Sequence, residues 1–308
     1  MGMVIWPDLP WRAFEGSQPI MPMETGRLVE TDRLEPSLAH TIDGTSTARL
    51  ARFEQRVLQC GRAMPIPTFR LLSLQQPVGQ GATGARYVGV QGVAKEHRAG
   101  SYTVVNEWVA AELARQLRLP IPPSFISLFG DTKYFVSMNF ALSEEALPPV
   151  VAAAVVGAQP DLAARVTMFD AFIVNEDRHA QNMAMHPTTH ELMIFDHSHC
   201  MCGQGAVGTA RAFLEAHRGH LAIIGRHALV PELTSAADLC VAVARITDLP
   251  ERVVREIALE SRSFDVPPDE ATFLADYLVA RQHALMGMLA AERNGFPKVR
   301  QEELEACV

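Results

Sequence analysis

The sequence predicts an α+β fold in which a small, β-rich first part precedes a mainly helical second part. Residues 69–138 consist mostly of short apolar runs bounded by turn residues, with one helical segment among them. After about residue 143, apolar side chains recur at three- and four-residue spacing, as in amphipathic helices. We therefore expect an irregular arm over residues 1–45, a β-rich segment over 46–141 and a helical segment over 142–308.

The bulk composition excludes several classes of protein. With 308 residues, of which 48% are hydrophobic, the chain can bury a substantial core in one large or two modest domains. A net charge of -8 argues against a general nucleic-acid or anionic-membrane surface, so we expect neither direct nucleic-acid binding nor membrane association. The sequence lacks a run of about 18 apolar residues and a signal-peptide pattern. Five cysteines, an odd number, suit a reducing compartment, and we expect a cytoplasmic protein.

The first 65 residues carry few signals. Prolines at positions 7, 10, 19, 22 and 36 interrupt the apolar pattern, so residues 1–45 are expected to form an arm that lies on the body of the protein. An inhibitory or partner-binding role for this arm is the alternative. Residues 46–59 show helical spacing and end before Gly61 and Pro65, which predicts a helix.

A glycine-rich segment with Gly79, Gly81 and Gly84 lies between two strand-like runs, residues 69–74 and 85–90. The dinucleotide-binding fingerprint requires a helix directly after such glycines. A strand at this place favours instead a glycine-rich flap between antiparallel strands, whose backbone N–H groups can lie over nucleotide phosphates. A GxGxxG pattern alone is weak evidence for either.

Lys95 ends the next strand, and a helix is expected over residues 103–117. Glu107 shares a helix face with small residues, which are Ala110, Ala111 and Ala114, whereas Glu112 lies on the solvated face. An acid on an inward face needs a partner, and Lys95 is the one that the sequence offers. The alternative is that Glu107 is an ordinary surface residue.

Further elements complete the prediction. A hairpin is expected over residues 125–138, with residues 139–141 as the passage to the helical segment. Helices are expected over residues 147–156, 162–174, 207–217, 236–246, 251–259 and 270–293, before a loose, charged tail over 294–308.

Three residues with oxygen-bearing side chains, Asp177, Asn182 and Asp196, follow in fixed order around a predicted hairpin of two short apolar strands. Asn182 comes just before the first strand and Asp196 just after the second, so the hairpin brings them to the same end. Oxygen ligands of this kind suit Mg²⁺. Four soft ligands follow closely, which are His197, His199, Cys200 and Cys202. They are too crowded to surround one zinc ion easily, so we expect them to be neighbours of the site and leave their role open.

The chain resembles the HipA-like kinases in four places. They are the glycine segment, Lys95, the segment NEWVAAELARQLRLPIPP, and the segment DAFIVNEDRHAQN with the FDHS that follows it. The DRHxxN loop is also similar to that of the phosphoinositide 3/4-kinases. The resemblance implies a two-lobed, protein-kinase-like fold, with an N-lobe over residues 46–141 and a C-lobe over 142–308. It also implies that residues 139–141 bind adenine.

The resemblance implies a role for each site residue, and chemistry supports it. Lys95, oriented by Glu107, would hold the ATP phosphates under the glycine flap. Asp177 would orient the acceptor hydroxyl or take its proton, and Asn182 and Asp196 would bind Mg²⁺.

Two further residues within this loop, His179 as a candidate catalytic residue and Arg178, and one residue before it, Asp170, also have expected roles. His179 would transfer a proton or only support the loop by hydrogen bonds. Arg178 is expected to pair with an acid or a phosphate, and Asp170 to stabilise the junction of helix and loop. The metal strand departs from the usual Asp-Phe-Gly, since His197 and Ser198 follow Asp196.

The resemblance thus implies a kinase that uses ATP and Mg²⁺ and phosphorylates Ser or Thr of a protein, itself included. It further implies a toxin–antitoxin setting with an antitoxin or regulatory partner. A kinase of small molecules or lipid headgroups is the alternative, which a closed acceptor pocket beside Asp177 would favour over an open groove. A third hypothesis, a non-catalytic nucleotide-binding scaffold, is disfavoured because every residue of the constellation is present.

Overall fold

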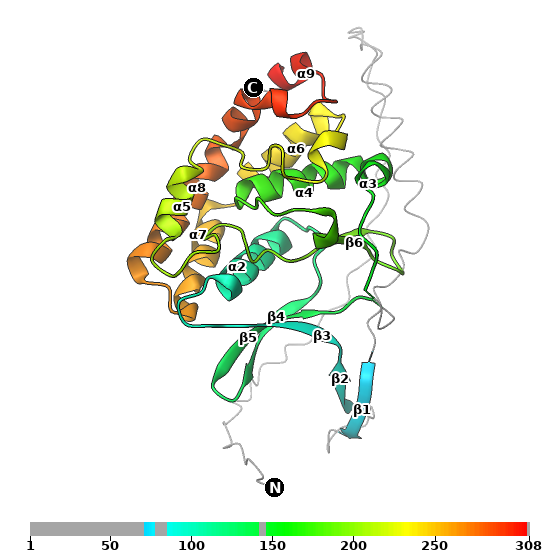
Figure 1. Ribbon diagram of the computed structural model, residues 1–308, viewed down its shortest axis with the longest axis vertical. Helices are drawn as coiled ribbons and strands as arrows, with labels where there is room; N and C mark the ends of the chain where they lie inside the picture. The colour runs from blue at the N-terminus through cyan, green and yellow to red at the C-terminus, as the bar shows by residue number, and fades with distance from the viewer. Residues whose placement is uncertain (1–70, 78–84, 142–145, 307–308) are drawn as a thin grey trace, which may run out of the picture. The chain divides into compact units, whose positions relative to one another are not determined.

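The computed structural model describes residues 71–77, 85–141 and 146–306, which all belong to one compact unit (Figure 1). The expected arm, the helix over residues 46–59, and Gly79, Gly81 and Gly84 lie outside the described residues. In the described part, helices and small antiparallel sheets occur together, so the predicted α+β class is confirmed. The boundary between two lobes at residue 141 stays a prediction.

The strands of the described residues form three small antiparallel sheets. They are β1 (Leu71–Pro77) with β2 (Arg86–Val90); β3 (Gly92–Glu96), β5 (Thr132–Met138) and β4 (Ser124–Phe129), in the order β3-β5-β4; and β6 (Met183–Met185) with β7 (Leu192–Ile194). The hairpins predicted over residues 125–138 and around residue 188 are confirmed. In β3, Lys95 pairs with Phe135 of the central strand, which fixes its register.

The helices account for most of the core. They are α2 (Thr103–Gln116), α3 (Ala152–Ala158), α4 (Pro160–Phe172), α5 (Ala210–Ala216), α6 (Ala236–Thr247), α7 (Glu251–Leu259), α8 (Pro268–Ala291) and α9 (Gln301–Glu305). Short 3₁₀ turns, labelled η1 to η4, cover Ala180–Asn182, Val230–Glu232, Glu260–Phe264 and Arg293–Gly295. Figure 1 shows α8 as the long orange helix. Among the described residues, no helix combines the length and hydropathy that a bilayer-spanning segment needs.

Helix α2 is largely buried: nine of its fourteen residues are buried, six of them alanine or valine, and Asn106 and Glu107 are buried with them. It packs against β3 and β5 on one side and against α7 and η3 on another. The helix ends where Arg118 takes a left-handed φ of 52° and Pro120 follows, because proline cannot continue the hydrogen-bond ladder. This burial fixes the positions of the inward-facing side chains of α2, including those of Asn106 and Glu107.

Three predictions about local structure are wrong. The helix expected from residue 147 begins at Ala152, because Pro148 and Pro149 disfavour helical backbone before them. The tail expected to be loose contains α9, which packs on α6. Cys240, which the sequence would place among small buried hydrophobes, is only partly buried against the core, whereas Cys200 and Cys202 are free and buried.

Candidate active site

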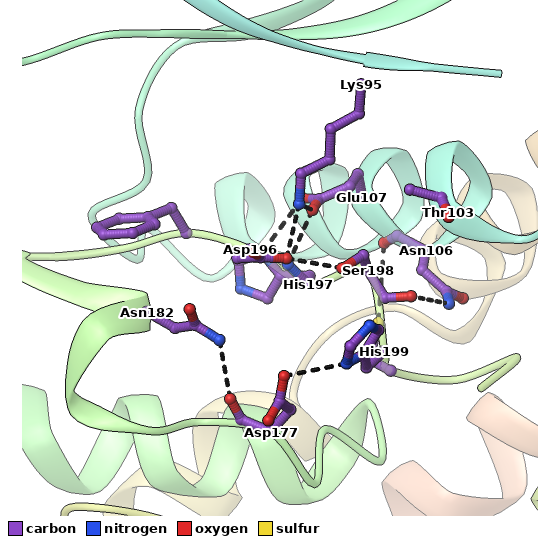
Figure 2. Close-up of polar contacts among 12 residues, drawn as sticks. Lys95, Thr103, Asn106, Glu107, Asp177, Asn182, Asp196, His197, Ser198 and His199 are labelled. Carbon is purple, nitrogen blue, oxygen red and sulfur yellow. Dashed lines mark hydrogen bonds and ion pairs between the residues drawn. The ribbon is translucent and has the colours of Figure 1, made fainter. Parts of the chain in front are cut away.

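Lys95, Glu107 and Asp196 meet although they come from three distant parts of the chain. The Nζ atom of Lys95, on β3, lies 2.5 Å from Oε1 of Glu107 on α2 and 2.6 Å from Oδ1 of Asp196, which follows β7 (Figure 2). Glu107 is 3% exposed, whereas Asp196 is 42% exposed. Lys95 therefore contacts two carboxylates: that of Glu107 is buried and orients the ammonium group, and that of Asp196 is accessible to solvent.

Electrostatics keeps all three groups charged. Burial opposes the charged form of Lys95, but the charge of Glu107 and the hydrogen bond to Asp196 outweigh it and raise the pKa of Lys95. Burial would likewise raise the pKa of Glu107, yet the hydrogen bond from His197 and the charge of Lys95 lower it. The pKa of Asp196 is also lowered, because hydrogen bonds from Lys95 and Ser198 outweigh its burial.

The backbone at Asp196 has an unusual conformation. Its φ of 59° lies in the left-handed region, which residues other than glycine adopt infrequently. The Oγ atom of Ser198 donates to Oδ1 of Asp196 at 2.7 Å, and the N–H of His197 donates to Oε1 of Glu107 at 3.1 Å. These contacts stabilise the turn that presents the Asp196 carboxylate beside Lys95.

Asn106 is a site residue that sequence reasoning missed. Its side chain is fully buried, and Nδ2 donates to the carbonyl oxygens of Ser198 at 2.8 Å and Gly203 at 3.1 Å. Its Oδ1 accepts from the N–H of Cys202 at 3.1 Å. Asn106 and Glu107 together therefore hold the segment after Asp196 against α2. The one available signal was a buried-face position occupied by an amide, which a single sequence cannot assign to distant partners.

Arg178 fixes the loop between α4 and β6. Its guanidinium is fully buried and donates from Nε to Oδ2 of Asp170 at 2.8 Å and from Nη2 to Oδ1 at 3.0 Å. Nη1 donates to the carbonyl oxygens of Asn182 at 2.9 Å and Phe195 at 2.7 Å. Both ends of the β6–β7 hairpin are thus tied to α4. The expected pairing of Arg178 with an acid and the structural role of Asp170 are confirmed.

With the loop held by Arg178, Asp177 and Asn182 lie next to each other. Nδ2 of Asn182 donates to the backbone carbonyl of Asp177 at 2.9 Å, so the amide oxygen lies on the opposite side of the group (Figure 2). The carboxylate of Asp177 is 44% exposed, and its Oδ2 lies 3.0 Å from Nδ1 of His199. Nε2 of His179 lies 3.9 Å from Oδ1 of Asp177, too far for a hydrogen bond.

A cavity of about 460 Å³ extends from this constellation toward residues 138–141. Lys95, Glu107 and Asp196 line its polar end. The other lining residues are mostly apolar and include Val93, Ile121, Phe135, Phe140, Ala184 and Ile194. Such a volume, apolar on most sides with a few charged groups at one end, is typical of small-molecule sites. The segment over residues 139–141, expected to bind adenine, lies in its wall.

The donor set fits Mg²⁺. This ion is commonly held by one or two protein oxygens while substrate phosphates and water complete its shell. The amide oxygen of Asn182, whose nitrogen donates to Asp177, and the 42% exposed carboxylate of Asp196 would supply such oxygens. The described residues contain no group of three or more His, Cys, Asp or Glu side chains arranged to hold a metal ion.

The comparisons with known proteins give a match to one family over part of the chain and two distant structural likenesses. Residues 80–217 match the sequence model of the HipA-like kinases. No curated protein matches the chain. HipA of Shewanella oneidensis MR-1, solved with HipB and operator DNA of its toxin–antitoxin system, shares 14% identity at a TM-score of 0.37, over 78% of this chain and 72% of that chain.

The proinflammatory kinase CtkA of Helicobacter pylori shares 12% identity at a TM-score of 0.43, over 67% of this chain and 90% of that chain. Both structural likenesses are distant, so the assignment depends on the sequence model. That model covers Lys95, Glu107 and the whole loop from Asp177 to Asp196. The predicted resemblance of this chain to the HipA-like kinase family is therefore confirmed over residues 80–217.

Proposed function

We propose that this protein is a kinase that uses ATP and Mg²⁺ to phosphorylate a hydroxyl group, with Ser or Thr of a protein as the acceptor. The observation that carries the proposal is the position of Lys95 Nζ, 2.5 Å from Glu107 and 2.6 Å from Asp196 at the polar end of the cavity. In this arrangement a lysine presents a fixed positive charge to phosphates.

Each side chain has a definite task in the proposed reaction. The apolar part of the cavity takes the base of ATP, while Lys95 binds its phosphates. Asn182 and Asp196 hold Mg²⁺, which neutralises charge on the transferring phosphoryl group. Asp177 orients the acceptor hydroxyl or accepts its proton. His179 stands close enough to assist through water, and both hypotheses for it stay predictions.

The exposure of the acceptor side favours a protein over a small molecule. Asp177 is 44% exposed and His179 is 47% exposed, and neither lines the cavity that would hold the nucleotide. A loop or terminus of another protein can approach such a carboxylate. A small-molecule kinase would gain more from an enclosed acceptor pocket. We further propose a regulatory protein partner of the antitoxin kind, which the resemblance to the HipA-like kinases implies. The expected absence of direct nucleic-acid binding stays a prediction.

The test measures transfer of label from γ-labelled ATP with Mg²⁺ to the protein itself and to dephosphorylated casein. The wild type should transfer label, whereas Asp177→Ala and Asp196→Ala should not. Asp131→Ala, at the exposed turn between β4 and β5, is the matched control and should behave as wild type. Absence of transfer and of ATP consumption by the wild type would refute the enzyme proposal. Equal transfer by all variants would place the chemistry elsewhere.

A further inference from the structure

His199 contacts the carboxylate that the proposed reaction needs. Its Nδ1 atom lies 3.0 Å from Oδ2 of Asp177. Among the described residues, no other side chain lies within hydrogen-bonding distance of this carboxylate, since Nε2 of His179 is 3.9 Å from Oδ1. The backbone of Asp177 is fixed separately, because its N–H donates to Oδ1 of Asn175 and its carbonyl accepts from Asn182.

We propose that His199 is a positioning residue that donates a hydrogen bond from Nδ1 to Oδ2 of Asp177. This inference rests on the proposed kinase function and assigns a task to one of the residues left without a role in the sequence. The bond holds the half-exposed carboxylate in one orientation and leaves Oδ1 to the acceptor hydroxyl. Without it, the carboxylate is free to rotate about its side-chain bonds, and the reactive orientation becomes one of several.

The tautomer of His199 follows from its two neighbours. Nδ1 lies 3.0 Å from Asp177 Oδ2 and 2.8 Å from Nε2 of Gln204. A carboxylate oxygen only accepts hydrogen bonds, so a favourable contact with Asp177 requires a proton on Nδ1. The amide of Gln204 can present either its nitrogen or its oxygen to the ring, and with its oxygen there it accepts from the same N–H. Both contacts are then satisfied by one proton on Nδ1.

The position of His199 is set by helix α2. Asn106 holds the carbonyl of Ser198 on one side of His199 and the N–H of Cys202 on the other. Cys200, the next residue, is fully buried. The neighbouring Glu107 holds the N–H of His197 and pairs with Lys95. The same helix therefore sets the phosphate-binding lysine and, through His199, the carboxylate at the acceptor side (Figure 2).

The test compares three substitutions of His199 in the full chain. Asparagine places an amide N–H close to where Nδ1 was, glutamine places it near the former Nε2, and alanine removes it. We expect His199→Ala and His199→Gln to lower kcat about 10- to 100-fold, the range for a lost hydrogen bond to a charged group, with KM for ATP within about twofold of wild type. His199→Asn should retain most of kcat.

The matched control is His283→Ala, since His283 is also a half-exposed histidine with its Nε2 2.8 Å from a carboxylate, that of Glu251, and lies outside the site. Its kcat should equal that of wild type. Equal kcat in all three His199 variants of an active enzyme would overturn the inference. So would a fall in His199→Asn as large as in His199→Ala.

A spectroscopic measurement separates this inference from the proposed function. Histidine ¹⁵N NMR should show the proton of His199 on Nδ1 in the wild type. In Asp177→Ala only Gln204 faces Nδ1, and its amide nitrogen can donate to an unprotonated Nδ1, so the proton should move to Nε2. A wild type with its proton on Nε2 would overturn the inference whatever the activity. An inactive wild type with the proton on Nδ1 would instead refute the kinase while leaving the contact between His199 and Asp177 established.

Discussion

Arg178 and Asp170 form a fully buried ion pair in which nearly every polar atom has a partner. Beyond the two bonds between them, Oδ1 of Asp170 accepts from Asn175 at 2.7 Å and Oδ2 lies 3.1 Å from Nε2 of His227. Taking two charges out of water costs several kcal/mol each, and such pairs are stable only when further hydrogen bonds satisfy them. Because Arg178 also donates to the backbone carbonyls of Asn182 and Phe195 at the site, this pair fixes the geometry of the site more than it adds stability.

At the residue scale, we expect stability to fall in acid through Asp170. Burial opposes its charge, yet the charge of Arg178 and the hydrogen bond from His227 hold its pKa below the ordinary value. An aspartate with a lowered folded pKa contributes stability that is present above about pH 4, where the unfolded chain loses its proton, and is lost as the pH falls through the folded pKa.

Urea denaturation at pH values from about 3 to 7 measures this contribution. Asp170→Asn should be less stable than wild type by about 3–5 kcal/mol near neutral pH, since it leaves Arg178 without its counter-charge. The difference between the two proteins should shrink as the pH falls below about 4. A difference that stays constant down to pH 3 would show that Asp170 does not stabilise the fold as a carboxylate.

At the scale of elements, α2 joins two halves of the site through adjacent residues. Glu107 orients Lys95, and Asn106 holds the segment over residues 198–203. The two side chains leave the helix in different directions, as Figure 2 shows, so one buried helix can serve both tasks. A displacement of α2 would therefore disturb the phosphate side and the acceptor side together.

Substitution of Asn106 should strongly lower the free energy of unfolding. Asn106→Ala leaves the carbonyls of Ser198 and Gly203 and the N–H of Cys202 without their partner, and we expect a loss of about 2–5 kcal/mol in the free energy of unfolding. Asn106→Asp has the same shape but presents oxygen to both carbonyls, so it should be no better than alanine. Gln116→Ala, at the exposed end of α2, is the control and should change stability by less than about 0.5 kcal/mol. Near-wild-type stability of Asn106→Ala in urea would contradict this role.

The elements were largely predictable because periodicity reports which face of a segment is buried. It identified α2 with Glu107 on its inner face, the β6–β7 hairpin and the central residues of α8. Periodicity does not report partners, so the contacts of Asn106 with residues about a hundred positions away were beyond it. The position of His199 next to Asp177 depends on those contacts and was missed for the same reason.

The C-terminal tail was mispredicted because charge was weighed above a few apolar residues. Phe296, Val299 and Leu304 are all buried, and α9 packs on α6. We expect Leu304→Ala to lower the free energy of unfolding by about 2–5 kcal/mol, as for a buried leucine. Glu302→Ala, on the exposed side of the same helix, should have almost no effect in the same denaturation experiment. If Leu304→Ala were as stable as the control, the result would support the original prediction of a loose tail.

At the scale of the whole molecule, the cavity exists because segments far apart in the chain meet. Lys95 of β3 reaches Asp196, which follows β7. Contacts away from the cavity link α2 and β5 to η3, since Trp108 donates to Glu260 at 2.6 Å and Lys133 donates to the carbonyl of Ser263 at 2.6 Å. Nucleotide that binds in the cavity, whose wall combines β3, α2, β5 and the segment after β7, should therefore stabilise the described unit as a whole rather than one element.

We expect ATP with Mg²⁺ to raise the melting temperature more than ATP alone. At a ligand concentration of 100 times Kd the native state gains about 2.7 kcal/mol, or about 5–10 °C for a domain of this size. Lys95 Nζ lies 2.6 Å from Asp196 Oδ1, so the lysine neutralises the carboxylate that we propose as the metal ligand. If the phosphates of ATP bound Lys95 as proposed, this pairing would weaken, and ATP and Mg²⁺ should consequently bind better together than either does by itself.

The Asp196→Asn variant separates the stabilisation by ATP alone from the additional stabilisation by Mg²⁺. This variant keeps Glu107 as the partner of Lys95, 2.5 Å from its Nζ, so the stabilisation by ATP alone should persist. The additional rise with Mg²⁺ should be lost, because a neutral amide binds the ion more weakly than a carboxylate. Thermal denaturation of both proteins with ATP, with Mg²⁺ and with the two combined measures each effect, and Asp131→Asn serves as the charge-matched control. An unchanged response to Mg²⁺ in Asp196→Asn would mean that another residue holds the ion.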